Sequence, residues 1–200
     1  KNSRKLENLL NAYSDRGTTQ SQAARIAREI PGTVEFINEV VEAIQDELAL
    51  YYSSDIIAAV ERVLAAISPR LREEAISFKN FHVEGDWNAK GFIDETDFAT
   101  LFNDVLDNAL AAMQGCETKE LMVKIFNDEK KVFVEVMDSG CGIKKENIDR
   151  IFDLEFSAKE EGGFGLYHAR EILNKYGGKI KVTQSTPGKG TTVRLEIRRV

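Results

Sequence analysis

The stretch Asp138-Ser139-Gly140-Cys141-Gly142-Ile143 follows a strand-like run, residues 131–137, whose β-branched and aromatic side chains suit a half-buried pleated surface. A carboxylate therefore emerges where this strand is predicted to end. The two glycines carry no Cβ, so the backbone can turn sharply there and approach a bound group closely. An ordinary strand-ending turn can have the same sequence. What accompanies this stretch elsewhere in the chain decides between the two interpretations.

The composition excludes several classes of protein. The 200 residues suffice for one large or two small domains. The chain has 27 Lys and Arg against 33 Asp and Glu, a net charge of −6, which disfavours a general nucleic-acid or anionic-membrane surface. It contains no apolar run of bilayer length and no signal-like start, so we expect the chain as given to be soluble.

The two cysteines, Cys116 and Cys141, lie in different segments. They form neither a disulfide framework nor a zinc-spaced cluster, which fits a reducing cytoplasm. The chain begins at Lys1 without an initiator methionine, so it could be part of a longer protein.

Residues 1 to about 70 are predicted to be helical, with a break at Pro31-Gly32. Apolar residues then recur at spacings of three and four at Val34, Ile37, Val41, Ile44 and Leu48. This stripe suits a helical hairpin or a dimeric bundle, and it suits an intramolecular core equally well. A further helix over residues 56–67 is expected to end at Ser68-Pro69. We therefore expect residues 1–71 to form a helical dimerisation-type segment.

From residue 72 onward, short strands mix with helices. The short turn at residues 127–129 predicts an antiparallel hairpin, and the mixture as a whole predicts an α+β domain, one sheet covered by helices on one face. Strands are predicted at residues 75–83, 92–93, 121–126, 131–137, 179–183 and 191–198, and helices at 97–113, 145–152 and 165–176.

Asp104 and Asn108 are four residues apart on the predicted helix 97–113, so they lie on the same side of it. A carboxylate and an amide oxygen so placed suit Mg²⁺, which takes hard oxygen ligands and keeps waters and nucleotide phosphates as its remaining ligands. A pair of solvated polar residues is the alternative interpretation.

A third stretch, residues 160–166, is rich in glycine and opens the predicted helix 165–176. The free amides and the positive dipole end of such a helix attract phosphate. The stretch is not a dinucleotide-binding fingerprint, because no strand leads into it. The chain also lacks the Gly-x-x-x-x-Gly-Lys-[Ser/Thr] pattern, which excludes a Walker-type phosphate loop.

Together these stretches resemble the boxes of the GHKL ATP-binding superfamily. The order and spacing of the boxes agree over residues 72–200. The resemblance implies a two-layer α/β sandwich of the Bergerat type, a mixed sheet with helices on one face, that binds ATP and Mg²⁺. Residues 101–109 resemble the N box, 138–142 the G1 box, 151–159 the F box and ATP lid, 163–166 the G2 box, and 176–192 the tail usual in sensor histidine kinases.

The resemblance implies a role for each matching residue. Asp138 would accept a hydrogen bond from the adenine amino group, and a carboxylate there selects an amino-bearing purine over guanine. Asn108 would ligate Mg²⁺. Gly140 and Gly142 would shape the adenine pocket, Thr191 would partner Asp138 and an adenine-bound water, Gly163, Gly165 and Leu166 would meet the phosphates through backbone amides, and Lys159 would contact a phosphate from the lid.

Two departures from the family pattern stand out. Asp104 occupies the position at which typical histidine kinases have Asn and the related ATPases have a water-activating Glu. A phosphoacceptor histidine is also missing from its expected context, since His82 and His168 are the two histidines and both are expected to be structural. Arg28, in a run that ends at Pro31, vaguely resembles an acceptor position with the wrong proline spacing. We therefore expect no autophosphorylation of this chain on histidine.

The leading interpretation is the ATP-binding catalytic region of a two-component sensor histidine kinase, which transfers the γ-phosphate of ATP to a histidine. We expect a cytoplasmic homodimer joined through the N-terminal helices, with a response regulator as partner. One alternative is a GHKL ATPase in which Asp104 orients water. Another is a non-catalytic regulator that senses nucleotide.

Overall fold

The computed structural model describes residues 32–33, 35–37, 52–86, 88, 90–154 and 164–200. The chain divides into two compact units, Lys1–Leu48 and Ala49–Val200. In the first unit the described residues, 32–33 and 35–37, are helical. Ile37 is the member of the apolar stripe that falls among them, and it is 47% exposed. The other positions of the stripe, and the helices expected before Pro31, lie outside the described residues.

The second unit is built on a five-stranded mixed sheet with the order β2-β4-β5-β7-β6. β2 (Ser77–Glu84) runs parallel to β4 (Glu120–Asn127). The antiparallel pairs follow from there through β5 (Lys131–Asp138), β7 (Gly190–Arg198) and β6 (Lys179–Thr186). The predicted hairpin and the mixed α+β sheet are confirmed.

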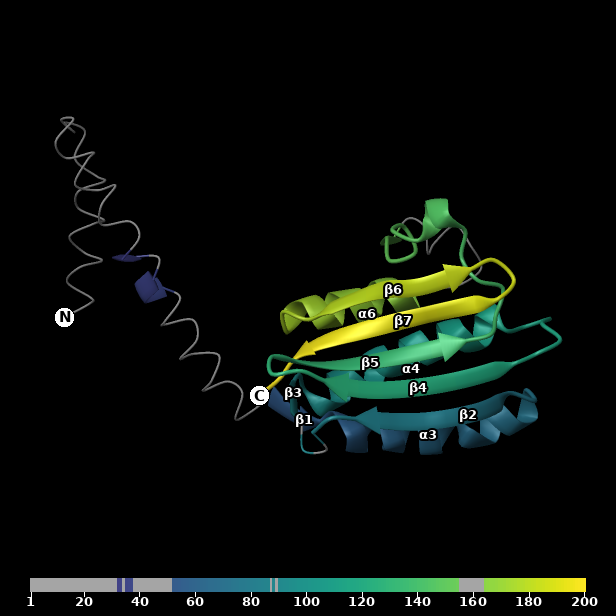
Figure 1. The fold of residues 1–200 in the computed structure, drawn as a ribbon, viewed down its shortest axis with the longest axis horizontal. Coiled ribbons are helices and arrows are strands. Elements are labelled where there is room, and N and C mark those ends of the chain that lie inside the picture. Colours follow the sequence, from purple (N-terminus) through teal and green to yellow (C-terminus); the bar gives the residue numbers. More distant parts are fainter. Residues whose placement is uncertain (1–31, 34, 38–51, 87, 89, 155–163) are drawn as a thin grey trace. The chain divides into compact units, whose positions relative to one another are not determined.

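Three helices, α3 (Ile56–Glu73), α4 (Glu95–Ala112) and α6 (Gly165–Lys175), lie on one face of this sheet (Figure 1). α4 contributes the most to the core, because its apolar residues recur at helical spacing and fill the space between sheet and helices. They are Phe98, Leu101, Phe102, Val105, Leu106, Ala109 and Leu110, and all are buried. From the sheet, alternate residues of β5 face them, as a period of two requires.

α3 belongs to this second unit. Its residues Ile56, Val60 and Val63 are buried in the same core cluster as the sheet, and the Asp55 carboxylate caps it by accepting from the Ala58 amide at 3.0 Å. The structural division after Leu48 therefore differs from the boundary expected after residue 71. Helical periodicity alone does not reveal which domain buries an apolar stripe.

The prediction that this helix ends at Ser68-Pro69 is wrong, because α3 continues through Pro69 to Glu73. Tertiary contacts hold the last turn in spite of the proline. Leu71 is buried, and the Arg70 guanidinium pairs with Glu74 at 2.7 Å and with Asp107 of α4.

The helix predicted over residues 145–152 is also replaced by tighter structure. A 3₁₀ turn, η1 (Lys145–Asn147), is followed by further turns through Asp153. The adjacent residues Ile151 and Phe152 are both buried, and turns rather than a regular helix bring both of them inward.

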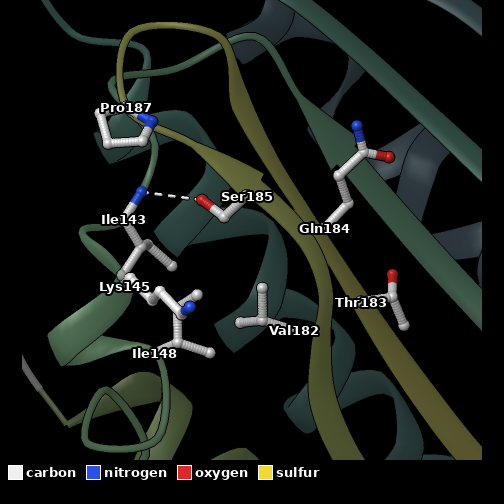
Figure 2. Close-up of a pocket in the computed structure, with 8 residues that line it drawn as sticks. All are labelled: Ile143, Lys145, Ile148, Val182, Thr183, Gln184, Ser185 and Pro187. Atoms are coloured by element: carbon white, nitrogen blue, oxygen red, sulfur yellow. Dashed lines mark hydrogen bonds between the residues drawn. The ribbon is translucent and has the colours of Figure 1, made fainter.

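A pocket of about 370 Å³ lies between this turn segment and the edge strand β6 (Figure 2). The side chains of Ile143, Ile148 and Val182 face the same space, whereas that of Gln184 points away. The Ile143 amide donates to the Ser185 hydroxyl at 2.8 Å, which joins the two walls. The remaining lining residues are Lys145, Thr183 and Pro187.

A second, two-stranded sheet pairs β1 (Ser53–Asp55) with β3 (Lys90–Phe92). β1 was not predicted, since Ser-Ser-Asp has little strand propensity. The strand forms because its neighbours satisfy its polar groups, as where the Ser54 hydroxyl donates to the Ile93 carbonyl at 2.6 Å.

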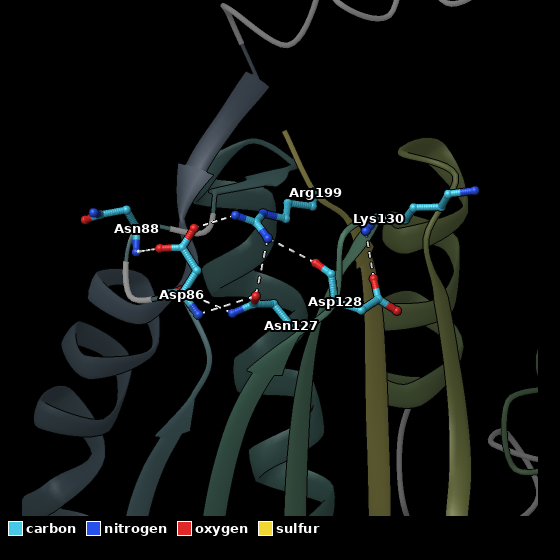
Figure 3. Close-up of polar contacts among 6 residues, drawn as sticks. All are labelled: Asp86, Asn88, Asn127, Asp128, Lys130 and Arg199. Carbon is cyan, nitrogen blue, oxygen red and sulfur yellow. Dashed lines mark hydrogen bonds and ion pairs between the residues drawn. The ribbon is translucent and has the colours of Figure 1, made fainter.

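Arg199 and Val200 tie the small sheet to the large one, and Figure 3 shows the side-chain contacts of Arg199. The Val200 amide donates to the Lys90 carbonyl at 3.0 Å. The Arg199 guanidinium pairs with Asp86 and donates to the Asp128 carbonyl at 3.1 Å and the Asn127 side-chain oxygen at 3.4 Å.

Among the described helices, none combines the length and the apolar character that a membrane crossing requires.

Candidate functional site

Asp138 ends β5, where it pairs in register with Thr191 of β7. The residue is only 9% exposed, and its Oδ1 accepts from the Gly140 amide at 2.8 Å. Burial raises the pKa of the Asp138 carboxyl, and the backbone amides of Gly140 and Thr191 oppose that shift. A carboxylate so far removed from water gains from a further hydrogen-bond donor supplied by a ligand.

The glycines of this turn are required by close backbone approach. A Cβ added at Gly140 would lie 2.6 Å from the Ala112 carbonyl oxygen, at the end of α4. At Gly142, where φ is +68°, it would lie 2.2 Å from the Thr186 carbonyl oxygen. The turn is thus held between α4 and the β6–β7 hairpin, as the hydrogen bond from the Cys141 amide to the Ala112 carbonyl at 2.9 Å also indicates.

Thr191 is buried directly beside this turn. Its hydroxyl lies 3.0 Å from that of Ser185, which also accepts from the Ile143 amide. Gly190, with φ of +104°, would place a Cβ 1.9 Å from the Asp138 carbonyl oxygen. Ser185 and Gly190 were not predicted as parts of the site, although the two glycines of the hairpin, Gly188 and Gly190, could have indicated close packing.

α4 carries the link between this turn and α6. Asp104, Asn108 and Ala112 recur every four residues and therefore share one side of the helix, over about 12 Å. Ala112 contacts the turn at residues 138–142, called the G1 turn from here on. Asp104 lies at ordinary contact distance from Gly165, the first residue of α6, where an added Cβ would be 3.5 Å from the Asp104 Cβ. The half-buried Asn108 lies between them.

Asp104 also contacts α6 through its side chain, since its Oδ2 lies 2.8 Å from the Nδ1 of His168. Burial raises the pKa of the Asp104 carboxyl, and the hydrogen bond with His168 opposes this. The sequence analysis singled out both residues without linking them. They are separated by 64 residues, so the contact has no signal in local spacing and needs the packing of α4 on α6.

The donor set fits Mg²⁺ held together with phosphate oxygens. Asn108 offers a hard amide oxygen beside the carboxylate of Asp104. Within the described ranges, no group of three or more His, Cys, Asp or Glu side chains could hold a metal ion. An ion held at Asn108 therefore needs waters and ligand phosphates to complete its coordination, which is the usual situation for Mg²⁺.

α6 begins with free backbone donors. Phe164 stands at its N-cap without a side-chain hydrogen bond to the helix, so the first amides keep their capacity to bind an anion. Leu166 is 6% exposed and anchors this turn in the core. Lys159 and Gly163, the other predicted phosphate contacts, lie outside the described residues.

The chain is similar to known proteins in both sequence and fold. The family described as histidine kinase-, DNA gyrase B-, and HSP90-like ATPase matches residues 93–200. The probable C4-dicarboxylate sensor kinase of Bacillus subtilis (strain 168) is 29% identical over 107 residues, 52% of this chain and 20% of that protein. The signal transduction histidine-protein kinase ArlS of Staphylococcus aureus (strain USA300) is 27% identical over 177 residues, 82% of this chain and 39% of that protein.

The chain thus spans well under half the length of these two relatives. Among solved structures, the catalytic domain of the histidine kinase ThkA shares the fold with a TM-score of 0.65 at 24% identity, over 74% of this chain and 96% of that one. The family match covers more than half of the chain. It includes Asp104, Asn108 and Ala112 on α4, the G1 turn and α6. The chain belongs to the family of histidine kinase-, DNA gyrase B- and HSP90-like ATPases.

Proposed function

We propose that this chain is the ATP-binding catalytic region of a two-component sensor histidine kinase, which delivers the γ-phosphate of ATP to a histidine. The stripe of Asp104, Asn108 and Ala112 on α4 carries the proposal. One end of it touches the G1 turn and the other touches the start of α6. A nucleotide bound along this stripe has its adenine beside the carboxylate of Asp138 and its phosphates beside the first backbone amides of α6.

At the adenine end, Asp138 accepts a hydrogen bond from the exocyclic amino group. Its burial makes this bond discriminating, because a purine without the amino donor leaves a desolvated carboxylate unpaired. Gly140 and Gly142 keep the turn thin enough for the ring, and Thr191 supports Asp138 and an adenine-bound water.

At the phosphate end, Asn108 holds Mg²⁺ while Gly163, Gly165 and Leu166 present backbone amides and Lys159 offers a cation. Bound Mg²⁺ neutralises charge on the phosphate oxygens. The chain's own contribution is positioning, since phosphoryl transfer depends mainly on holding donor and acceptor in line.

The proposed acceptor histidine is neither of the two histidines of this chain, His82 and His168. The relatives are sensor kinases by name, which supports a response regulator as partner. A cytoplasmic site of action fits the two cysteines, which form no disulfide framework. The apolar stripe that contains Ile37 supports a homodimer. Ile37→Asp would place an unpaired charge in that seam, at a cost of several kcal/mol. Light scattering tests this, and a monomeric wild type at high micromolar concentration would assign the stripe to an intramolecular core.

The function is tested with γ-labelled Mg-ATP, measuring label on the protein and phosphate released. We expect the wild type to remain unlabelled, because His82 lies on β2 paired with Glu84 and His168 is held by Asp104. Arg28→His should acquire an acid-labile, base-stable label if Arg28 occupies the acceptor position. Such a label on His82 or His168 of the wild type would overturn the expected absence of an acceptor.

The second candidate is an ATPase, and the contact between Asp104 and His168 favours it. Steady phosphate release with no label on the wild type or on Arg28→His would identify an ATPase. Nucleotide-dependent partner binding with neither signal would identify a nucleotide-sensing regulator instead.

A further inference from the structure

β6 is an edge strand of the five-stranded sheet (Figure 1). Among the described residues it pairs with β7 alone. An edge strand turns every second amide and carbonyl group away from its neighbour, and an extended peptide can pair with these outward-facing groups. The register slips between Val182 and Gln184, so Thr183 has no register partner in β7. This irregular part of the edge lies at the pocket, which the same residues help to line.

The pocket runs along the edge of β6 rather than over one face of the sheet. Successive side chains of a strand point to opposite faces, yet four consecutive residues, 182–185, line the pocket. Gln184 lines it although its side chain points away (Figure 2). The backbone of the strand therefore forms part of the wall.

The opposite wall is formed by residues 143–150. Its apolar side chains Ile143 and Ile148 face the same space as Val182 of β6 (Figure 2). The pocket is distinct from the proposed nucleotide site, because none of the eight described residues that line it is assigned to adenine, Mg²⁺ or phosphate. With a volume of about 370 Å³, it has room for one large apolar side chain.

The charge around the pocket is positive in a chain whose net charge is −6. Lys145 lines the pocket itself, and both Lys145 and the adjacent Lys144 are exposed. β6 contains two exposed lysines and no acid, although Lys181 also pairs with Glu196 of β7. The charged residues of the two walls are Lys144, Lys145, Arg150, Lys179 and Lys181 against Glu146 and Asp149.

We infer that this edge binds an extended acidic segment of another protein, which adds to the sheet beside β6 and places one apolar side chain in the pocket. Backbone pairing with the outward-facing groups of β6 supplies affinity, and the pocket supplies specificity. Acidic residues on either side of the apolar one meet Lys145 and the lysines of β6. The binding needs no nucleotide, so the inference does not depend on the proposed function.

The same charge decides between a foreign segment and a second copy of this chain. Two copies joined edge to edge through β6 would bring Lys179 and Lys181 of one copy close to those of the other. Like charges that face each other across strands are destabilising. An acidic strand has the opposite effect, because it neutralises these lysines and is attracted to them before contact.

A library of random peptides displayed on phage is the first probe. Selection on the whole wild-type chain should enrich peptides in which an apolar residue is flanked by Asp or Glu. Enrichment of basic or uncharged peptides, or no enrichment at all, would overturn the inference.

The strongest acidic peptide is then labelled with fluorescein, and its anisotropy gives the dissociation constant for each variant. Ile148→Ala should weaken binding by about tenfold, because the apolar side chain of the peptide loses contacts. Lys145→Glu should weaken it by about tenfold at low salt and by less at high salt. Since Lys145 is exposed, this variant keeps the test valid if Ile148→Ala does not fold.

Gln184→Ala is the matched control on the same strand, because the Gln184 side chain points away from the pocket (Figure 2). It should leave the dissociation constant within about twofold of the wild-type value. Equal affinities for the wild type, Ile148→Ala and Lys145→Glu would place the peptide elsewhere on the molecule and overturn the inference.

Methylation of the peptide amides, one at a time, tests the addition of a strand. Paired and unpaired amides alternate along an added strand. Methylation should therefore abolish binding at every second position and be tolerated at the positions between. A uniform response along the peptide would show binding without strand addition and would contradict the inference.

Discussion

The two ends of the proposed nucleotide site differ in construction. The proposed adenine end consists of backbone packed against backbone, with glycines at Gly140, Gly142 and Gly190 that leave no space for a Cβ, and with the buried carboxylate of Asp138. The phosphate end consists of polar side chains on helix surfaces, with His168 half exposed. Changes to the glycines of the adenine end should therefore cost stability, whereas changes at the phosphate end should alter binding and chemistry in a folded protein.

The largest effect is expected for Gly190→Ala. The added Cβ would collide with the Asp138 carbonyl oxygen at 1.9 Å, and φ is +104°. We expect a loss of about 3 kcal/mol in the free energy of unfolding, from backbone strain and overpacking together. Urea denaturation followed by circular dichroism measures it.

Gly188→Ala, in the same hairpin turn, is the matched control. Its φ is +74°, but an added Cβ would have no neighbour within 4 Å. It should cost only the conformational penalty of about 1 kcal/mol. Equal losses in the two variants would show that the close approach of Gly190 to the Asp138 backbone contributes nothing to the free energy of unfolding.

Asp138→Asn should weaken ATP binding by about 10- to 100-fold, the worth of a hydrogen bond to a buried charged group. The amide is a poorer acceptor, and its NH₂ can face the adenine donor. Calorimetric titration measures the dissociation constant. An unchanged ATP affinity would remove Asp138 from the reading of adenine.

Asn108→Ala tests the phosphate end. It should weaken ATP binding by about tenfold when Mg²⁺ is present and much less when the ion is chelated. The free energy of unfolding should hardly change, since Asn108 is only half buried. Equal losses of affinity with and without Mg²⁺ would argue against Asn108 as the ligand.

A smaller effect is expected in the pH dependence of stability. Burial raises the pKa of Asp138 above its ordinary value of 3.8, so the folded state binds this proton more tightly than the unfolded chain does. The resulting stabilisation is complete below about pH 3.8 and is lost as pH rises through the folded pKa. Asp138→Asn lacks this loss.

The unfolding free energies of the wild type and Asp138→Asn should therefore diverge in favour of the variant as pH rises above 3.8. Urea midpoints between about pH 3 and pH 8 measure the difference. A difference that stays constant across that range would show that Asp138 is not desolvated in the folded protein.

The same contrast explains what sequence could predict. Part of the proposed adenine end lies within one strand and the turn that follows it, so local composition was enough to predict β5 and a turn with two glycines at its end. The antiparallel pairing of β4 with β5 also followed from their short connection. The apolar periodicity of α4 predicted its buried face. The spacing of four residues placed Asp104 and Asn108 on the same side of the helix.

Features that depend on long-range packing were missed. β1 forms only because β3 and Ile93 satisfy it, and α3 passes Pro69 because Leu71 and Arg70 find partners elsewhere. The contact between His168 and Asp104 was not predicted, because it exists only when α4 and α6 pack together. Local patterns contain no record of such contacts.

The most direct test of the central claim is a calorimetric comparison of Mg-ATP with Mg-GTP on the wild-type chain. The account predicts saturable binding of Mg-ATP in the micromolar to millimolar range, and Mg-GTP at least about tenfold weaker, because guanine offers no amino donor where Asp138 waits for one. Equal affinity for the two nucleotides, or no saturable binding of Mg-ATP, would contradict it.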